Sequence, residues 1–90
     1  MARANRAGAT PREGPTVHNE GSTPVTVRIV VRADTTDAES VTLDAGASRA
    51  VGTPPTAVIE VHTADGSAAA EANADPLFVV REGHVLVSPW

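Results

Sequence analysis

The 90-residue sequence contains no cysteine, lysine or tyrosine, and its only aromatic residues are Phe78 and Trp90. The absence of cysteine excludes a disulfide scaffold, a cysteine-ligated zinc module and a blue-copper centre, which needs a cysteine thiolate. No apolar run approaches the ~18 residues of a membrane-spanning helix, and no secretory h-region follows the N-terminus. We therefore expect one small domain. Its default location is cytoplasmic, with an exported site left open in case the start codon is misassigned.

Amphipathic helices are also missing, because no segment of ten or more residues has a helical period. The chain does contain segments in which apolar and polar residues alternate. Within 25–32, valine and isoleucine alternate with mostly polar residues, which predicts a strand with one buried face. Residues 57–63 behave alike, with Ala57, Ile59 and Val61 on one face. Shorter strands are expected at 16–19 (at a sheet edge), 40–43, 48–51, 67–74 (alanine-rich enough to be a helix instead), 77–80 and 85–88.

Turn residues separate these strands. Asp44-Ala45-Gly46-Ala47, Asp65-Gly66 and Glu82-Gly83 are typical of tight turns, and 33–37 is expected to be a polar connection. Seven or eight short strands at spacings of ~8–12 residues predict an all-β fold, a small antiparallel β-sandwich or barrel. A parallel sheet would need crossover helices, and none is legible. We place a disordered basic arm at 1–15 and the β-sandwich domain at 16–90.

Charge is distributed unevenly between these two parts. Arg3, Arg6 and Arg12 give the arm a charge of +3, whereas residues 13–90 carry four arginines and eleven acids, a charge of −7. A short arm without a hydrophobic period is typical of a solvated, disordered end. The alternative is an arm that contacts nucleic acid, although three spaced arginines would grip phosphate weakly.

Four segments together resemble a known group of modules. They are Val-His-Asn-Glu at 17–20, the alternating strand at 25–29, the strand and turn at 41–49, and the strand entering Asp-Gly at 58–66. This succession is similar to the immunoglobulin-like β-sandwich modules common in uncharacterised haloarchaeal proteins. The resemblance implies a fold and no activity. Compared with antibody-type domains, the chain lacks paired cysteines, a central tryptophan and a tyrosine corner.

No catalytic, cofactor or metal site is predicted. His18, His62 and His84 have no metal-clip spacing, although they could meet across a sandwich with Glu20 or Glu60. The acidic stretch containing Asp34, Asp37 and Glu39 lacks the spacing of a calcium loop. A serine–histidine–aspartate set can be assembled on paper, but no nucleophile elbow is present. The serines in question are Ser40, Ser48, Ser67 and Ser88.

The remaining candidates are surfaces. Arg28 and Arg32 share the polar face of the central strand, where they either form a basic stripe with Arg81 or pair with acids on neighbouring strands. The hairpin at 77–88 is apolar on both faces. We expect one face in the core, with Phe78 and Trp90 at least partly buried, and the other, with Val80 and Leu86, available to a partner.

The sequence thus predicts a non-enzymatic module that serves protein interaction or a structural accessory role. Its working surface would be an edge strand that adds to a partner's sheet, or a sheet face. The partner would be another protein or a second copy of the chain, with no cofactor and no membrane span. A nucleic-acid-associated protein that uses the arginine arm is the alternative.

Overall fold

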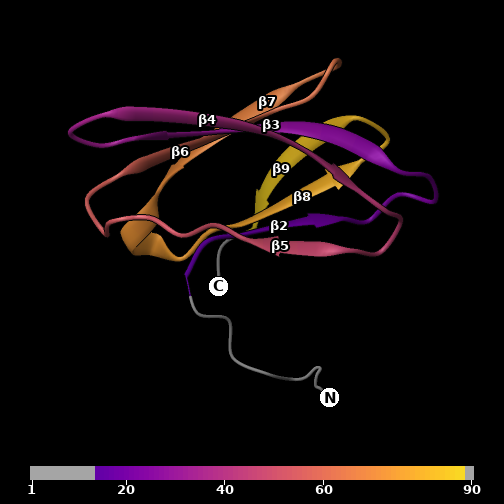
Figure 1. Cartoon of the computed structure of the whole chain (residues 1–90). Coiled ribbons are helices and arrows are strands. Elements are labelled where there is room, and N and C mark those ends of the chain that lie inside the picture. Colours follow the sequence, from indigo (N-terminus) through magenta and orange to yellow (C-terminus); the bar gives the residue numbers. More distant parts are fainter. Residues whose placement is uncertain (1–13, 89–90) are drawn as a thin grey trace.

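Two four-stranded sheets pack face to face in the computed structural model, which describes residues 14–88 (Figure 1). One sheet has the order β5-β2-β8-β9 and the other the order β4-β3-β6-β7. The predicted all-β sandwich is therefore confirmed. Its strands are β2 (Thr16–Asn19), β3 (Val25–Arg32), β4 (Thr36–Leu43), β5 (Ser48–Ala50), β6 (Val58–His62), β7 (Ser67–Glu71), β8 (Leu77–Arg81) and β9 (His84–Ser88), and a 3₁₀ helix, η1 (Ala72–Ala74), follows β7.

The position of β2 differs from the prediction. This strand lies inside its sheet, between β5 and β8, and it runs parallel to β8; the other pairs are antiparallel. A parallel pair needs a long crossover, which is usually a helix. Here strands supply the crossover, because the chain passes through β3 and β4 of the opposite sheet, through β5, and again through β6 and β7 of the opposite sheet before it reaches β8. The absence of helices therefore did not exclude a parallel pair.

Strand β4 is twice as long as expected. It begins at Thr36 rather than at residue 40, and it pairs with all of β3, from Arg32 opposite Thr36 to Val25 opposite Leu43. Its first half looks like a loop in the sequence because it is polar and exposed. Backbone pairing with the strongly β-forming β3 is sufficient to hold these residues extended.

The core consists of the inward faces of both sheets. Val27 and Ile59 from one sheet meet Val17, Phe78 and Val80 from the other, and the side chains of these five residues are almost completely buried. The prediction that Phe78 is buried is confirmed, whereas Trp90 lies outside the described residues, as do residues 1–13 of the predicted arm. Valine and isoleucine suffice because the two faces interdigitate over a layer ~10 Å thick.

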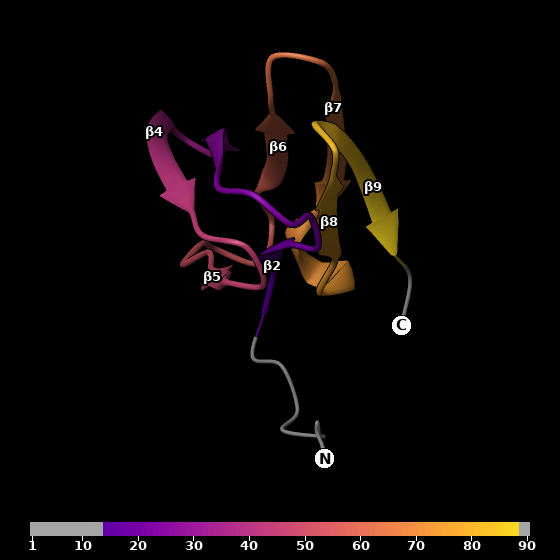
Figure 2. The same cartoon turned by 90° about the vertical axis from the view of Figure 1, so that its right-hand side faces the viewer.

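The two long sides of the sandwich are unlike each other (Figure 2), with β7 and β9 together on one side and β4 and β5 on the other. On the β7/β9 side the inward side chains of β7 are only Ala68 and Ala70, which lets the two edges approach. Thr63 Oγ1 also donates a hydrogen bond to the Gly83 carbonyl, tying the β6–β7 turn to the β8–β9 turn. This side is closed.

A buried amide organises the β4/β5 side. Asn19, at the end of β2, is 1% exposed. Its Nδ2 lies 2.8, 3.0 and 3.2 Å from the carbonyl oxygens of Thr23, Leu43 and Asp44, and its Oδ1 accepts a bond from the Gly21 amide at 2.9 Å. One side chain therefore fixes both the β2–β3 loop and the point where β4 crosses to β5.

Replacing this amide tests its role. We expect Asn19→Ala to lower the free energy of unfolding by about 2–4 kcal/mol, because it removes the donor from carbonyl groups that are shielded from water. Asn73→Ala, which alters an exposed asparagine in η1, is the matched control and should change stability by less than ~0.5 kcal/mol. Urea titration followed by circular dichroism measures both. Equal losses in the two variants would contradict the assignment.

The closed side makes a second prediction, at Gly83. Its φ is +84°, and an added Cβ would lie 2.6 Å from Asp65 Oδ2. Gly83→Ala should therefore cost about 1–3 kcal/mol, and part of the loss should return in the double variant with Asp65→Ala. Gly52→Ala, where an added Cβ meets nothing within 4 Å, is the control. If Gly83→Ala is as stable as Gly52→Ala in thermal melts, the two turns are not in tight contact.

Candidate functional site

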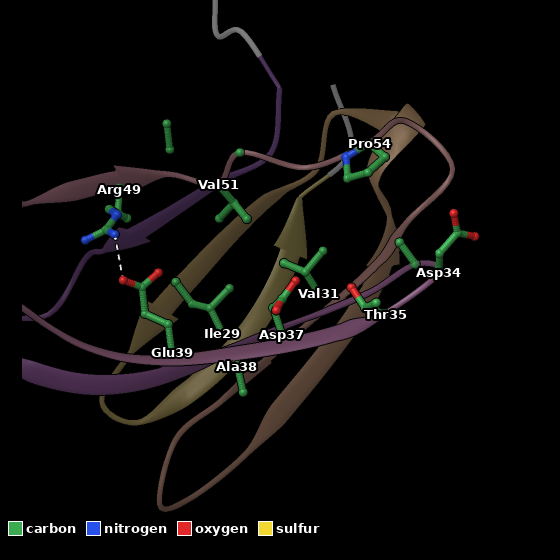
Figure 3. A pocket seen from close by; sticks show the side chains of 13 residues that line it. Ile29, Val31, Asp34, Thr35, Asp37, Ala38, Glu39, Arg49, Val51 and Pro54 are labelled. Atoms are coloured by element: carbon green, nitrogen blue, oxygen red, sulfur yellow. Dashed lines mark hydrogen bonds and ion pairs between the residues drawn. The ribbon is translucent and has the colours of Figure 1, made fainter.

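A groove opens on the β4/β5 side of the sandwich (Figure 3). It has a volume of about 440 Å³, and it is bounded by residues 29–39 of β3, β4 and their turn and by residues 49–54. We call it the β4 groove. Ile29, Val31 and Val51 make it apolar, whereas Asp37 and Glu39 line it with carboxylates. An apolar cleft with a few convergent polar groups is the usual form of a binding site.

The register of β4 explains why acids face inward here. Glu39 is opposite Ile29 and Asp37 is opposite Val31, and directly paired residues share a face of the sheet. The same parity carries Val41 and Leu43 into the core further along β4. Sequence reasoning missed this site, because it began the strand at residue 40 and interpreted the acids before it as a loop. Extending the alternation backward from Leu43 would have found it.

The difference in length between the two edge strands leaves the acids uncovered. β4 has eight residues and β5 has three, so β5 faces only one end of β4. Beyond Ala50 the chain continues through Gly52 and Pro54 as a wall of the groove rather than as a strand. Asp37 and Glu39 therefore stay exposed although they lie on the inner face of the sheet.

The charges in the groove are only partly balanced. Arg49 Nη2 lies 2.9 Å from Glu39 Oε2, an ion pair that links β5 to β4 across the opening. The Asp37 carboxylate has no hydrogen-bond or ion-pair partner among residues 14–88. With Asp34 at the rim, three carboxylates and one guanidinium give the groove a formal charge of −2.

The outer edge of β4 is available to another chain. In the described part of the molecule, β3 is the only strand that pairs with β4. An edge strand with one neighbour presents a row of backbone donors and acceptors along its free side. The groove therefore lies directly beside eight residues of free strand edge.

The structure corrects one of the predicted surface residues. Val80 is fully buried in the core, because the hairpin register places it opposite Val85. The outward pair is Val79 and Leu86, and the Leu86 side chain is 52% exposed. Leu86 therefore remains a candidate for contact with a partner, and Val80 does not.

Of the two alternatives for the arginines, the basic stripe does not form, because Arg81 belongs to the opposite sheet. Arg28 and Arg32 do share the outer face of β3, but Arg32 Nε is bound to Glu60 Oε2. Arg81 is ion-paired with Glu20. Neighbouring acids thus occupy two of the three arginines, which is the other outcome that the sequence allowed.

The three histidines lie apart on the outer faces. His18 Nδ1 is 2.6 Å from Ser48 Oγ, on the sheet opposite the one that carries His62. No acid among residues 14–88 bonds to His18, so this pair lacks the third member of a catalytic triad. Within the same range, no group of three or more metal-ligating side chains occurs. The only helix there has three residues, too few to cross a bilayer.

No protein-family model matches the chain, and no match was found among curated proteins or solved structures. Within residues 14–88, the β4 groove combines a cavity, an unpaired carboxylate and a free strand edge in one place.

Away from the groove, the Glu60 carboxylate on the outer face of β6 is bonded to both Arg32 and His62. The hydrogen bond from Arg32 and a second bond, at 2.9 Å, to His62 Nε2 lower the pKa of the Glu60 carboxyl from its ordinary value. The same contact raises the pKa of Arg32. The ionised carboxylate is therefore favoured by folding.

This network gives a pH prediction. Because folding lowers the pKa of Glu60, its stabilisation is present above the unfolded value of 4.5 and disappears as pH falls through the lower folded value. Glu60→Gln should therefore melt below the parent at neutral pH, and the difference should shrink on acidification below 4.5. Melting curves across this range measure the effect. A constant difference at every pH would show that the charge is not involved.

Proposed function

We propose that this domain is a non-enzymatic protein-interaction module that binds an extended segment of a partner along β4. The observation that carries the proposal is the free edge of an eight-residue strand beside a groove that has both apolar and acidic side chains. A strand added to such an edge gains main-chain hydrogen bonds, and pockets beside the edge select its alternate side chains.

The other edges are less suited to this role. β5 has three residues, too few for a long ladder. β7 and β9 lie against each other across the sandwich, and the turns beside them are tied together. The outer face of β8 and β9 offers the exposed Leu86 side chain for apolar contact. Among residues 14–88, β4 therefore has the longest free edge of any edge strand, and it borders the β4 groove along residues 37–39.

We also propose that the domain is immunoglobulin-like in the broad sense of a two-sheet sandwich. The turn and strand motifs quoted from the sequence support this. The strand order is less supportive, because β3 and β4 form a hairpin within one sheet. In the constant-type immunoglobulin order, the second and third strands belong to different sheets.

Selection from a displayed library of extended peptides tests the interaction. We expect the selected peptides to shift the backbone amide resonances of residues 36–43. Leu86→Ser should leave their affinity unchanged, because it alters a distant face. Shifts confined to the Leu86 face, or affinity lost in Leu86→Ser, would contradict the proposal.

A pair of proline variants supplies the main-chain control. Adjacent residues of an edge strand direct their amides to opposite sides. Of the two variants Ala38→Pro and Glu39→Pro, one therefore removes an amide that bonds to β3, and the other removes an amide on the free edge. The variant that keeps its melting temperature has lost the free amide. That variant should bind selected peptides at least about fivefold more weakly. Unchanged affinity would show that the ligand does not pair with β4.

A further inference from the structure

We infer that the segment bound along β4 belongs to another protein and carries cationic side chains at alternate positions, two residues apart. This inference rests on the proposed function and names the chemistry of the ligand. It follows from the placement of Asp37 and Glu39, which are two residues apart on the inner face of an edge strand.

An added strand would lie ~4.8 Å from β4, with every second side chain on the same face as the two acids. Directly opposite side chains then have Cβ atoms about 4.5–5.5 Å apart, within reach of an ion pair. A cation at one position meets Asp37, and a cation two residues along meets Glu39. On the other face the added strand meets only uncharged side chains, those of Thr36, Ala38, Ser40 and Thr42.

The rest of the groove suits arginine or lysine. Val31 and Val51, which are partly exposed, offer apolar surface on which the methylene stem of such a residue can lie. The charged end then reaches Asp37, which has no partner among residues 14–88. The formal charge of −2 favours a cationic strand. An acidic strand would be repelled by the carboxylates, and a purely apolar strand would remove water from them without supplying a partner.

Two other occupants fit less well. A second copy that paired its β4 antiparallel about Ala38 would set Asp37 of one chain against Glu39 of the other, a repulsive arrangement. The chain's own N-terminal segment carries arginines at positions 3, 6 and 12, and no two of these are two residues apart. Neither occupant therefore brings two cations, two residues apart, to Asp37 and Glu39.

Two synthetic peptides of identical composition test the inference on the full chain. The first, Thr-Arg-Thr-Arg-Thr-Arg-Thr, places all arginines on one face of a strand. The second, Thr-Arg-Arg-Thr-Thr-Arg-Thr, has the same charge without a two-residue spacing. In an NMR titration at low salt we expect the alternating peptide to bind about five- to tenfold more tightly, with shifts along residues 36–43.

Two variants of the groove should change peptide binding in opposite directions. Asp37→Asn should reduce the preference for the alternating peptide over the second peptide to about twofold or less. Arg49→Gln should increase affinity for the alternating peptide, because it frees Glu39 from its ion pair. Glu71→Gln removes one charge from an exposed position outside the groove and serves as the control. Thermal melts confirm that each variant is folded.

The outcomes separate this inference from the proposed function. Equal binding of the two peptides along β4 overturns the cation spacing and leaves the edge function standing. Binding elsewhere, or of neither peptide, overturns the inference, and the edge function falls with it only if library-selected peptides also leave the resonances of residues 36–43 unshifted. A concentration-dependent dimer whose shifts map to β4 would assign the edge to a second copy, which also overturns the inference.

Discussion

The side-chain amide of Asn19 determines where the chain leaves one sheet and enters the other. By donating to the carbonyl groups of Leu43 and Asp44, it ends β4 at the place where the turn to β5 must begin. The main chain of Asn19 holds the same turn, through bonds of 2.9 Å to Ala47 O and 2.8 Å from Gly46 N. β4 and β5 therefore meet at one end only, and the β4 groove is the space where they diverge.

The two sides of the sandwich follow from different side chains. On the closed side, the small alanines of β7 let β7 and β9 approach each other, and the Thr63–Gly83 hydrogen bond ties together the turns beside them. On the open side, Asp37 and Glu39 keep the edge hydrated and prevent indiscriminate pairing, since inward-pointing charges protect an edge strand from aggregation. The same charges become recognition elements if the incoming strand brings the opposite sign. The same two carboxylates would then both protect the edge from aggregation and select a cationic strand.

Most of the fold could be predicted from the sequence, because alternation and turn chemistry are local. The faces of β3 and β6 and the turns at Gly46 and Gly83, both with positive φ, agree with the prediction. The interior place of β2 and its parallel pairing with β8 could not be predicted, because they depend on which distant strands become neighbours. The first half of β4 was missed because its acids resemble a loop until the register with Ile29 and Val31 is known.

Amide hydrogen exchange along β4 in the free protein tests the central claim most directly, because the account requires one side of this strand to be unpaired. We predict an alternating pattern over residues 36–43, in which amides bonded to β3 are protected and those between them exchange at nearly unprotected rates. Uniform protection along the whole strand would contradict the account, since it would show that the edge is already paired.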